Sequence, residues 1–467
     1  MRTAVWVTSA VVGVLVLGGG YAVADAYDLV PGVLTLEPAA PAPAPFPTVV
    51  GPGTATPALS GLDPAAPVPA AGQVQGKVDA LVADPRLGPS VGVVVADQLT
   101  GDVLAEHSAG TGRQPASIAK LLTAVAALTV LGPDTTLPTT AVLSGDQVVL
   151  VGGGDIMLGD KAGDPSAVDG RAGLGDLAAQ TAQALRDAGI TTVRLGVDDS
   201  LFTGPALSPG WDASYMGSGY VAPVTALAVH VGRTDPSKEY SQRQGDPSLS
   251  AGQAFAARLA EQGITVTGTV TRTAAPGGAT QVGAVASAPL RDVVEYFLTT
   301  SDNTVTEATA RLVAINQGQP ASFTGATTAV LSVVGTLGVD TTGAHLTDAS
   351  GLASGSAVPA TTFLGAVQLV TSPQHPVLRD IVVGMPIGGL TGTLATRYTT
   401  SDSRGLVRAK TGSLTGVTSL AGTVVTADGR ALDFVVMADQ TPGDQSAARA
   451  AVDAFVSNLG ACGCSSG

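Results

Sequence analysis

The spacing of apolar residues predicts an ordered series of elements at the start of the folded chain. A helix is expected over residues 74–83, followed by two strands, Val91–Ala96 and Val103–Glu106, joined by a tight turn. A run rich in Ala and Leu then predicts a buried helix over Ala116–Val130. This helix begins just after Pro115, and proline is favoured near the first turn of a helix.

The pattern changes from about residue 134 to 286, where short strands and glycine turns surround one predicted helix, Asp176–Ala188. No obvious chemistry lies in this stretch, and we interpret it as an inserted region. Helices return at Leu290–Leu298 and Thr304–Asn316, and further helices are expected up to about Val370.

The end of the chain is rich in strands, which are expected at Leu406–Leu414, Val417–Thr426 and Ala431–Ala438, with a final helix over Ser446–Leu459. Strands at both ends with helices between them predict an α/β (α+β) fold, whose antiparallel sheet is built from the two chain termini and flanked by helices. A large insert, forming one or two smaller domains, would interrupt this body.

The amino end predicts export. Residues 4–24 are uncharged and mostly apolar, and Ala22-Val23-Ala24 is a small-x-small site that a signal peptidase could cut. The same stretch is long enough to remain as a membrane anchor. The segment rich in proline and alanine that follows predicts a semi-rigid tether. The expected domains are a signal peptide or anchor (1–24), a linker (25–73), a main folded domain (74–133 and 287–460), inserted domains (134–286) and a tail (461–467).

Composition excludes several classes of function. Apolar residues make up 45% and charged residues 13% of the chain, which is typical of a globular body. A net charge of -14 argues against binding to nucleic acid or to anionic lipid surfaces. The two cysteines, Cys462 and Cys464, could form a local disulfide or remain free thiols. The four histidines lack metal-ligand spacing, so neither a metal nor another cofactor is expected.

Lysine is scarce, and this makes its positions informative. Only five of the 23 basic residues are lysines, and Lys120 and Lys410 both fall in recognisable motifs. Ser117 and Lys120 form Ser-x-x-Lys at a predicted helix amino end, where residues i and i+3 share a face. A lysine amine can then take the proton of a serine hydroxyl, which arginine cannot do. Alone, the pair would be better explained by a capping serine and a solvent-facing lysine.

Two further motifs follow in order. Ser301-Asp302-Asn303 lies between two predicted helices, and Lys410-Thr411-Gly412-Ser413 lies in a predicted strand. Separately, the first could be a helix cap and the second an ordinary strand. Together with Ser-x-x-Lys they form the set known from class A β-lactamases and penicillin-binding proteins.

Two other motif matches are rejected because the residues and elements around them do not fit the motif. Gly88-Pro89-Ser90-Val91-Gly92 matches the nucleophile elbow, but a strand follows it instead of the required helix. The glycines at 152–154 with Lys161 lack the Gly-Lys-Ser/Thr ending of a phosphate loop.

The chain resembles the low-molecular-mass class C penicillin-binding proteins, the D-alanyl-D-alanine carboxypeptidase/endopeptidase family. Beyond the three motifs, the resemblance rests on Val151–Asp155, Asp199–Phe202, Pro209–Trp211, Asp348–Leu352 and Met385–Gly389, and it covers about residues 77–460. It implies a serine transpeptidase/β-lactamase-like body, peptidoglycan peptides as substrates and inhibition by penicillin. Ala349, Ala353, Met385 and Ser413 are mild departures from the usual residues.

The resemblance also implies residue roles. Ser117 would be acylated, Lys120 would act as general base, and Ser301 would relay the proton to the leaving amine. Asn303 would bind the substrate backbone and Lys410 and Thr411 its carboxylate, in a strand continued by Gly412, and the N–H groups of Ser117 and Ser413 would form the oxyanion hole.

Two alternatives remain open on the sequence. One is a β-lactamase, which needs a base for deacylation that no motif identifies. The other is a catalytically silent peptidoglycan-binding protein. The balance of carboxypeptidase and endopeptidase activity and the oligomeric state also stay open.

Overall fold

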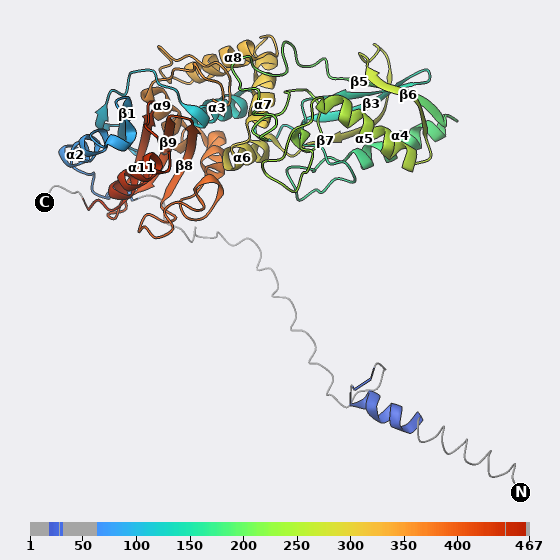
Figure 1. Ribbon diagram of the computed structural model, residues 1–467, viewed down its shortest axis with the longest axis horizontal. Coiled ribbons are helices and arrows are strands. Elements are labelled where there is room, and N and C mark those ends of the chain that lie inside the picture. Colours follow the sequence, from blue (N-terminus) through green and yellow to red (C-terminus); the bar gives the residue numbers. More distant parts are fainter. Residues whose placement is uncertain (1–17, 28, 31–62, 444, 464–467) are drawn as a thin grey trace, which may run out of the picture. The chain divides into compact units, whose positions relative to one another are not determined.

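The computed structural model describes residues 18–27, 29–30, 63–443 and 445–463 of the chain (Figure 1). Two compact units are distinguished, Met1–Ser60 and Gly61–Gly467. In the first unit, residues 18–26 are helical. Within the described ranges, no helix is both long enough and apolar enough to cross a membrane. The first 17 residues of the predicted leader, most of the predicted linker and Cys464 lie outside these ranges, and Cys462 is disulfide-bonded.

The first sheet of the larger unit joins the two ends of the folded chain (Figure 1). Its order is β2-β1-β10-β9-β8, and every neighbouring pair is antiparallel. This confirms the predicted fold class, an antiparallel sheet with helices around it. The strands are β1 (Val91–Asp97), β2 (Val103–His107), β8 (Val407–Leu414), β9 (Val417–Val425) and β10 (Ala431–Ala438).

Both faces of this sheet are covered, so β1 and β10 are buried along their whole lengths. Alternate residues point to opposite sides. Val93 and Val95 pack with α2 (Ala71–Val82) and α11 (Gln445–Gly460). Val94 joins a larger core formed with the central helices. These are α3 (Lys120–Val130), α6 (Leu290–Thr300), α7 (Asn303–Asn316), α8 (Phe323–Thr336), α9 (Ala360–Thr371) and α10 (Arg379–Gly384).

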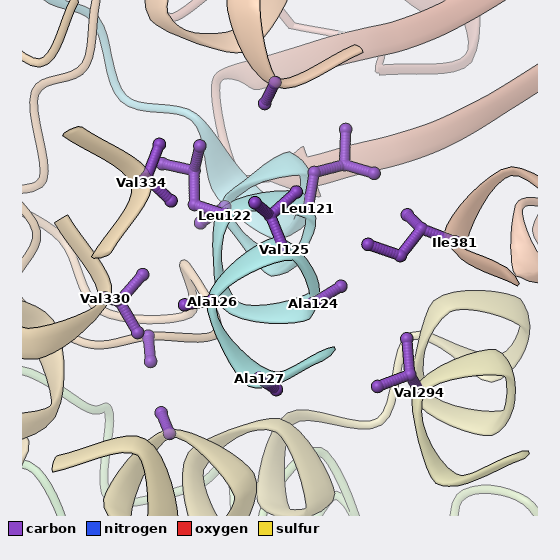
Figure 2. Packing of buried hydrophobic residues seen from close by; sticks show 14 of the residues in the cluster. Leu121, Leu122, Ala124, Val125, Ala126, Ala127, Val294, Val330, Val334 and Ile381 are labelled. Atoms are coloured by element: carbon purple, nitrogen blue, oxygen red, sulfur yellow. The ribbon is translucent and has the colours of Figure 1, made fainter. Parts of the chain in front are cut away.

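Helix α3 is surrounded by other helices. Figure 2 shows its side chains between Val294 of α6, Val330 and Val334 of α8 and Ile381 of α10. Because α3 is apolar on all sides, it is stable only when enclosed in this way. The enclosure fixes the position of its amino end. Short 3₁₀ helices complete the element list: η1 (Pro85–Leu87), η2 (Ala116–Ala119), η3 (His230–Gly232), η4 (Pro376–Leu378) and η5 (Gly392–Leu394).

The strands β3 to β7, which lie within the predicted insert, form a second sheet in the order β6-β5-β4-β3-β7. The β4-β5 and β5-β6 pairs are parallel, and the other two pairs are antiparallel. Two helices pack on it, α4 (Leu174–Asp187) and α5 (Pro247–Glu261). The strands are β3 (Pro138–Ser144), β4 (Gln147–Gly152), β5 (Thr192–Asp198), β6 (Thr265–Arg272) and β7 (Thr280–Ala286).

The expectation of a single helix in this stretch was wrong, because α5 is a second one. Its start carries a recognisable signal: Asp246 accepts a hydrogen bond from the N–H of Leu249, and Pro247 occupies the first turn. The many Ala and Gly residues that follow weakened the apolar periodicity.

Candidate active site

Ser117 lies in the 3₁₀ turn η2, immediately before α3, and not in the α-helix itself. The predicted alignment with Lys120 is kept, because residues i and i+3 eclipse one another in a 3₁₀ helix. The Lys120 amine donates a 2.9 Å hydrogen bond to the Ser117 hydroxyl.

The turn that carries Ser117 is held from two sides. Ala116 has a φ of +50°, a conformation that costs energy for an alanine. Ser419 of β9 donates a 2.6 Å hydrogen bond to the carbonyl oxygen of Pro115. Gly351 approaches the carbonyl of Ala116 so closely that a Cβ at this position would overlap it. The surrounding structure therefore imposes the conformation that presents Ser117.

Lys120 is fully buried, and its amine has three hydrogen-bond acceptors. Besides Ser117, these are Asn303 Oδ1 at 2.7 Å and the Ser350 carbonyl oxygen at 2.8 Å. Burial lowers the pKa of Lys120 to about 8, although nearby carboxylates oppose the shift. About a tenth of this amine is therefore neutral at pH 7, far more than for an ordinary lysine.

The Ser301-Asp302-Asn303 motif forms the junction between α6 and α7. Ser301 ends α6 in the left-handed conformation, with a φ of +62°. Asp302 caps α7 by accepting a 3.0 Å hydrogen bond from the N–H of Val305. Asn303 begins α7, and its Nδ2 donates to the carbonyl oxygen of Tyr220 at 2.9 Å. This sharp junction brings Ser301 and Asn303 to the two lysines.

Lys410 lies on β8, the edge strand of the first sheet, and is fully buried. Its amine donates to Ser301 Oγ at 3.0 Å and to the carbonyl oxygen of Thr411 at 3.0 Å. Burial, together with the charge of Lys120, holds the pKa of Lys410 well below its usual range. An anion bound here would reverse that effect by favouring the charged amine.

The rest of the Lys-Thr-Gly-Ser segment runs alongside Ser117. Thr411 Oγ1 lies 2.7 Å from Thr393 Oγ1. A Cβ on Gly412 would overlap Ser419 Oγ and lie 2.7 Å from the carbonyl oxygen of Pro115. Only glycine allows β8 to approach the Ser117 turn this closely. Ser413 Oγ accepts a 2.7 Å hydrogen bond from Arg449.

Sequence reasoning missed a layer of residues behind Lys120. Glu307 of α7 is buried and accepts hydrogen bonds from the N–H groups of Ala349 and Ser350. Burial and the neighbouring Asp348 raise the pKa of Glu307. From the sequence, Asp348 was named only as the first residue of Asp348–Leu352, a segment that resembles the family, and it was given no role. Neither acid belongs to the three motifs, so only the fold reveals that they hold the loop whose carbonyl contacts Lys120.

The three motifs thus converge on one buried cluster with a serine hydroxyl at its edge. The Ser117 hydroxyl and the Lys120 amine are in hydrogen-bond contact, and Lys410 contacts a second serine, Ser301. This arrangement is suited to acyl transfer through a serine. In the part of the chain that the structure describes, no group of His, Cys, Asp and Glu side chains could hold a metal ion. The fold and site define a serine acyl-transfer enzyme of the penicillin-binding type.

The chain belongs to the D-Ala-D-Ala carboxypeptidase 3 (S13) family, whose sequence profile matches residues 74–249 and 236–459. The carboxypeptidase DacB of Mycolicibacterium smegmatis is 38% identical, with 98% of each chain covered. A carboxypeptidase of Mycobacterium tuberculosis is 36% identical and covers 91% of this chain and 90% of its own. The protein is accordingly a serine D-Ala-D-Ala carboxypeptidase, and the members of its family act on the peptidoglycan of the cell wall.

The fold is also that of a solved relative. Penicillin binding protein 4 of Haemophilus influenzae superposes with a TM-score of 0.68 over 82% of this chain and 98% of its own, at 23% identity. The predicted family resemblance is therefore confirmed in both sequence and fold.

Proposed function

We propose that Ser117 is the nucleophile of this carboxypeptidase. Its hydroxyl would attack the carbonyl of the penultimate D-alanine, release the terminal D-alanine and leave an acyl-enzyme on Ser117. Water would then release the shortened stem peptide. Penicillin would acylate the same hydroxyl, and the resulting acyl-enzyme would be hydrolysed slowly. A structure of the Haemophilus influenzae protein in complex with a β-lactam supports the proposal.

The contacts of Lys120 carry this proposal. A neutral lysine amine has two hydrogens and one lone pair. The oxygens of Asn303 and Ser350, at 2.7 and 2.8 Å, can accept both hydrogens. The lone pair then faces Ser117 Oγ at 2.9 Å and can accept its proton. The site therefore favours Lys120 as the general base of acylation.

The other motif residues take complementary roles. Ser301, bonded to Lys410, would pass a proton to the leaving amine, and Asn303 would use its remaining amide hydrogen on the substrate backbone. Lys410 and Thr411 would bind the terminal carboxylate, which restores the charge of the buried lysine. The N–H groups of Ser117 and Ser413 would stabilise the oxyanion.

Export and organisation complete the proposal. Residues 1–24 would direct the chain across the membrane, as a cleaved signal or a retained anchor, and residues 25–73 would tether the catalytic body. That body would comprise residues 74–133 and 287–460, interrupted by the inserted domains at 134–286 and followed by the tail at 461–467.

A single substitution tests the role of Lys120. Lys120→Arg keeps a positive charge, but arginine does not give up its proton in proteins. Release of D-alanine from a D-alanyl-D-alanine pentapeptide should fall by roughly 10²–10⁴-fold, the usual contribution of a general base. Lys238→Arg, at an exposed lysine paired with Asp235, is the matched control. Activity retained by Lys120→Arg would contradict the assignment. Digestion of a cross-linked dimer of peptidoglycan peptides, carried out in parallel, measures the endopeptidase activity.

A further inference from the structure

The Ser301-Asp302-Asn303 junction is held by the segment between β5 and α5. The amide Nδ2 of Asn303 donates to the carbonyl oxygen of Tyr220 at 2.9 Å. The carboxylate of Asp302 pairs with Arg233 at 3.2 Å and with Arg243 at 3.7 Å. All three partners precede α5, in a stretch where the sequence showed no chemistry.

Arg243 joins these contacts into one unit. Its Nε and Nη2 donate to the carbonyl oxygen of Gly219 at 3.1 and 2.9 Å, and its Nη1 donates to that of Val231 at 2.9 Å. Its side chain is only 3% exposed. Gly219 precedes Tyr220, so the rigid guanidinium fixes the backbone that presents the Tyr220 carbonyl.

The Tyr220 carbonyl determines which way the Asn303 amide points. A carbonyl oxygen can only accept hydrogen bonds, so the NH₂ group of Asn303 must face it. The opposite end of the amide, Oδ1, then faces Lys120 at 2.7 Å. If the amide turned over, its NH₂ would face Lys120, and the amine would lose one of the acceptors that direct its lone pair to Ser117.

We propose that Arg243 is a positioning residue of the active site, acting through the Tyr220 carbonyl and Asn303 to aim the Lys120 amine at Ser117. The segment between β5 and α5 is then a working part of the catalytic apparatus. This inference rests on the proposed roles of Ser117 and Lys120.

The surroundings predict a signature in the pH profile. The titratable groups that act on Lys120 are the acids Asp302, Glu307 and Asp348 and the amine of Lys410. Loss of the Asn303 acceptor removes a group that stabilises the charged amine. The pKa of Lys120 should therefore fall. The acylation rate increases with pH as Lys120 loses its proton, and this increase is the acid limb of the pH profile. In the variant, the acid limb should lie at a lower pH than the value near 8 expected for the wild type.

The test uses Arg243→Gln in the full chain, with Arg272→Gln as a matched control. Arg272 is about half-exposed and pairs with Asp199 and Asp246, away from the motif residues. The rate of acylation by labelled penicillin is measured from pH 6 to pH 10, and kcat and KM are measured on the pentapeptide. For Arg243→Gln we expect kcat to fall by roughly 10- to 100-fold with little change in KM, and the acid limb to shift to lower pH. The control should match the wild type.

Three results separate the possible failures. An unchanged rate in Arg243→Gln, or a lower plateau with an unmoved acid limb, would overturn the positioning role, because general destabilisation lowers only the amount of active protein. A wild-type protein that penicillin does not acylate would overturn the proposed function instead, and this inference with it. If Arg243→Gln does not fold, Arg243→Lys replaces it, since an ammonium keeps the charge without the fork that spans both carbonyls.

Discussion

Asp348 offers a quantitative test of how the loop behind Lys120 is held. Its Oδ2 accepts hydrogen bonds from Trp211 Nε1 at 2.7 Å, the N–H of Ala353 at 2.8 Å and Ser350 Oγ at 3.3 Å. Its Oδ1 accepts one from the N–H of Gly351 at 2.8 Å. The carboxylate is completely buried, and the donors on Ser350, Gly351 and Ala353 are buried with it.

Asp348→Asn changes the charge and almost nothing in shape. The new side-chain amide can lie in two orientations. The less costly one keeps its oxygen in the place of Oδ2 and turns its NH₂ toward the N–H of Gly351. That buried N–H is left without a partner, at a cost of about 1–3 kcal/mol. The three remaining hydrogen bonds also lose their charged acceptor. We therefore expect the free energy of unfolding to fall by about 2–4 kcal/mol.

The assay is urea unfolding followed by tryptophan fluorescence, because Trp211 reports directly on this loop. Asp340→Asn, at an exposed carboxylate that accepts from the N–H of Thr342, is the control and should leave the transition in place. The charge of Asp348 also raises the pKa of Lys120, so its removal should move the acid limb of acylation to lower pH. An unchanged unfolding transition in Asp348→Asn would refute the reasoning.

Two further predictions concern other parts of the body. Gly412→Ala should lower the acylation rate by at least roughly 10-fold, because its Cβ would overlap Ser419 Oγ and displace the Ser117 turn. The control is Gly277→Ala, since the space around Gly277 is open. Equal rates of penicillin labelling in the two variants would contradict this prediction. Burial raises the pKa of Asp433 to about 7. The stability that its protonated form contributes is complete below about pH 4 and is lost as the pH rises through 7. Asp433→Asn should therefore gain Tm relative to the wild type between pH 5 and pH 8, and a Tm difference that does not depend on pH would exclude this.

The short motifs in the sequence were enough to select side chains that the fold brings together. Ser117, Lys120, Ser301 and Lys410 all meet in one cluster, and the sheet joins both ends of the chain as predicted. The i and i+3 spacing was informative even though Ser117 lies in a 3₁₀ turn, because both helix types align such residues.

What the sequence could not predict depends on long-range contacts and backbone atoms. The carbonyls of Tyr220 and Ser350 have no side-chain signature, since every residue has a carbonyl. Glu307 lies on a helix where an acid would normally face solvent, and only burial against Asp348 distinguishes it. Arg243 could not be separated from other arginines without knowledge of the fold.

The most direct test of the central claim is the intact mass of the protein after incubation with penicillin. We predict that the wild type gains one penicilloyl adduct, that peptide mapping locates it on Ser117, and that Ser117→Ala gains none. Ser166→Ala, at an exposed serine bonded to Asp164, should be labelled like the wild type. An adduct on Ser117→Ala, or one that maps to another residue of the wild type, would contradict the account.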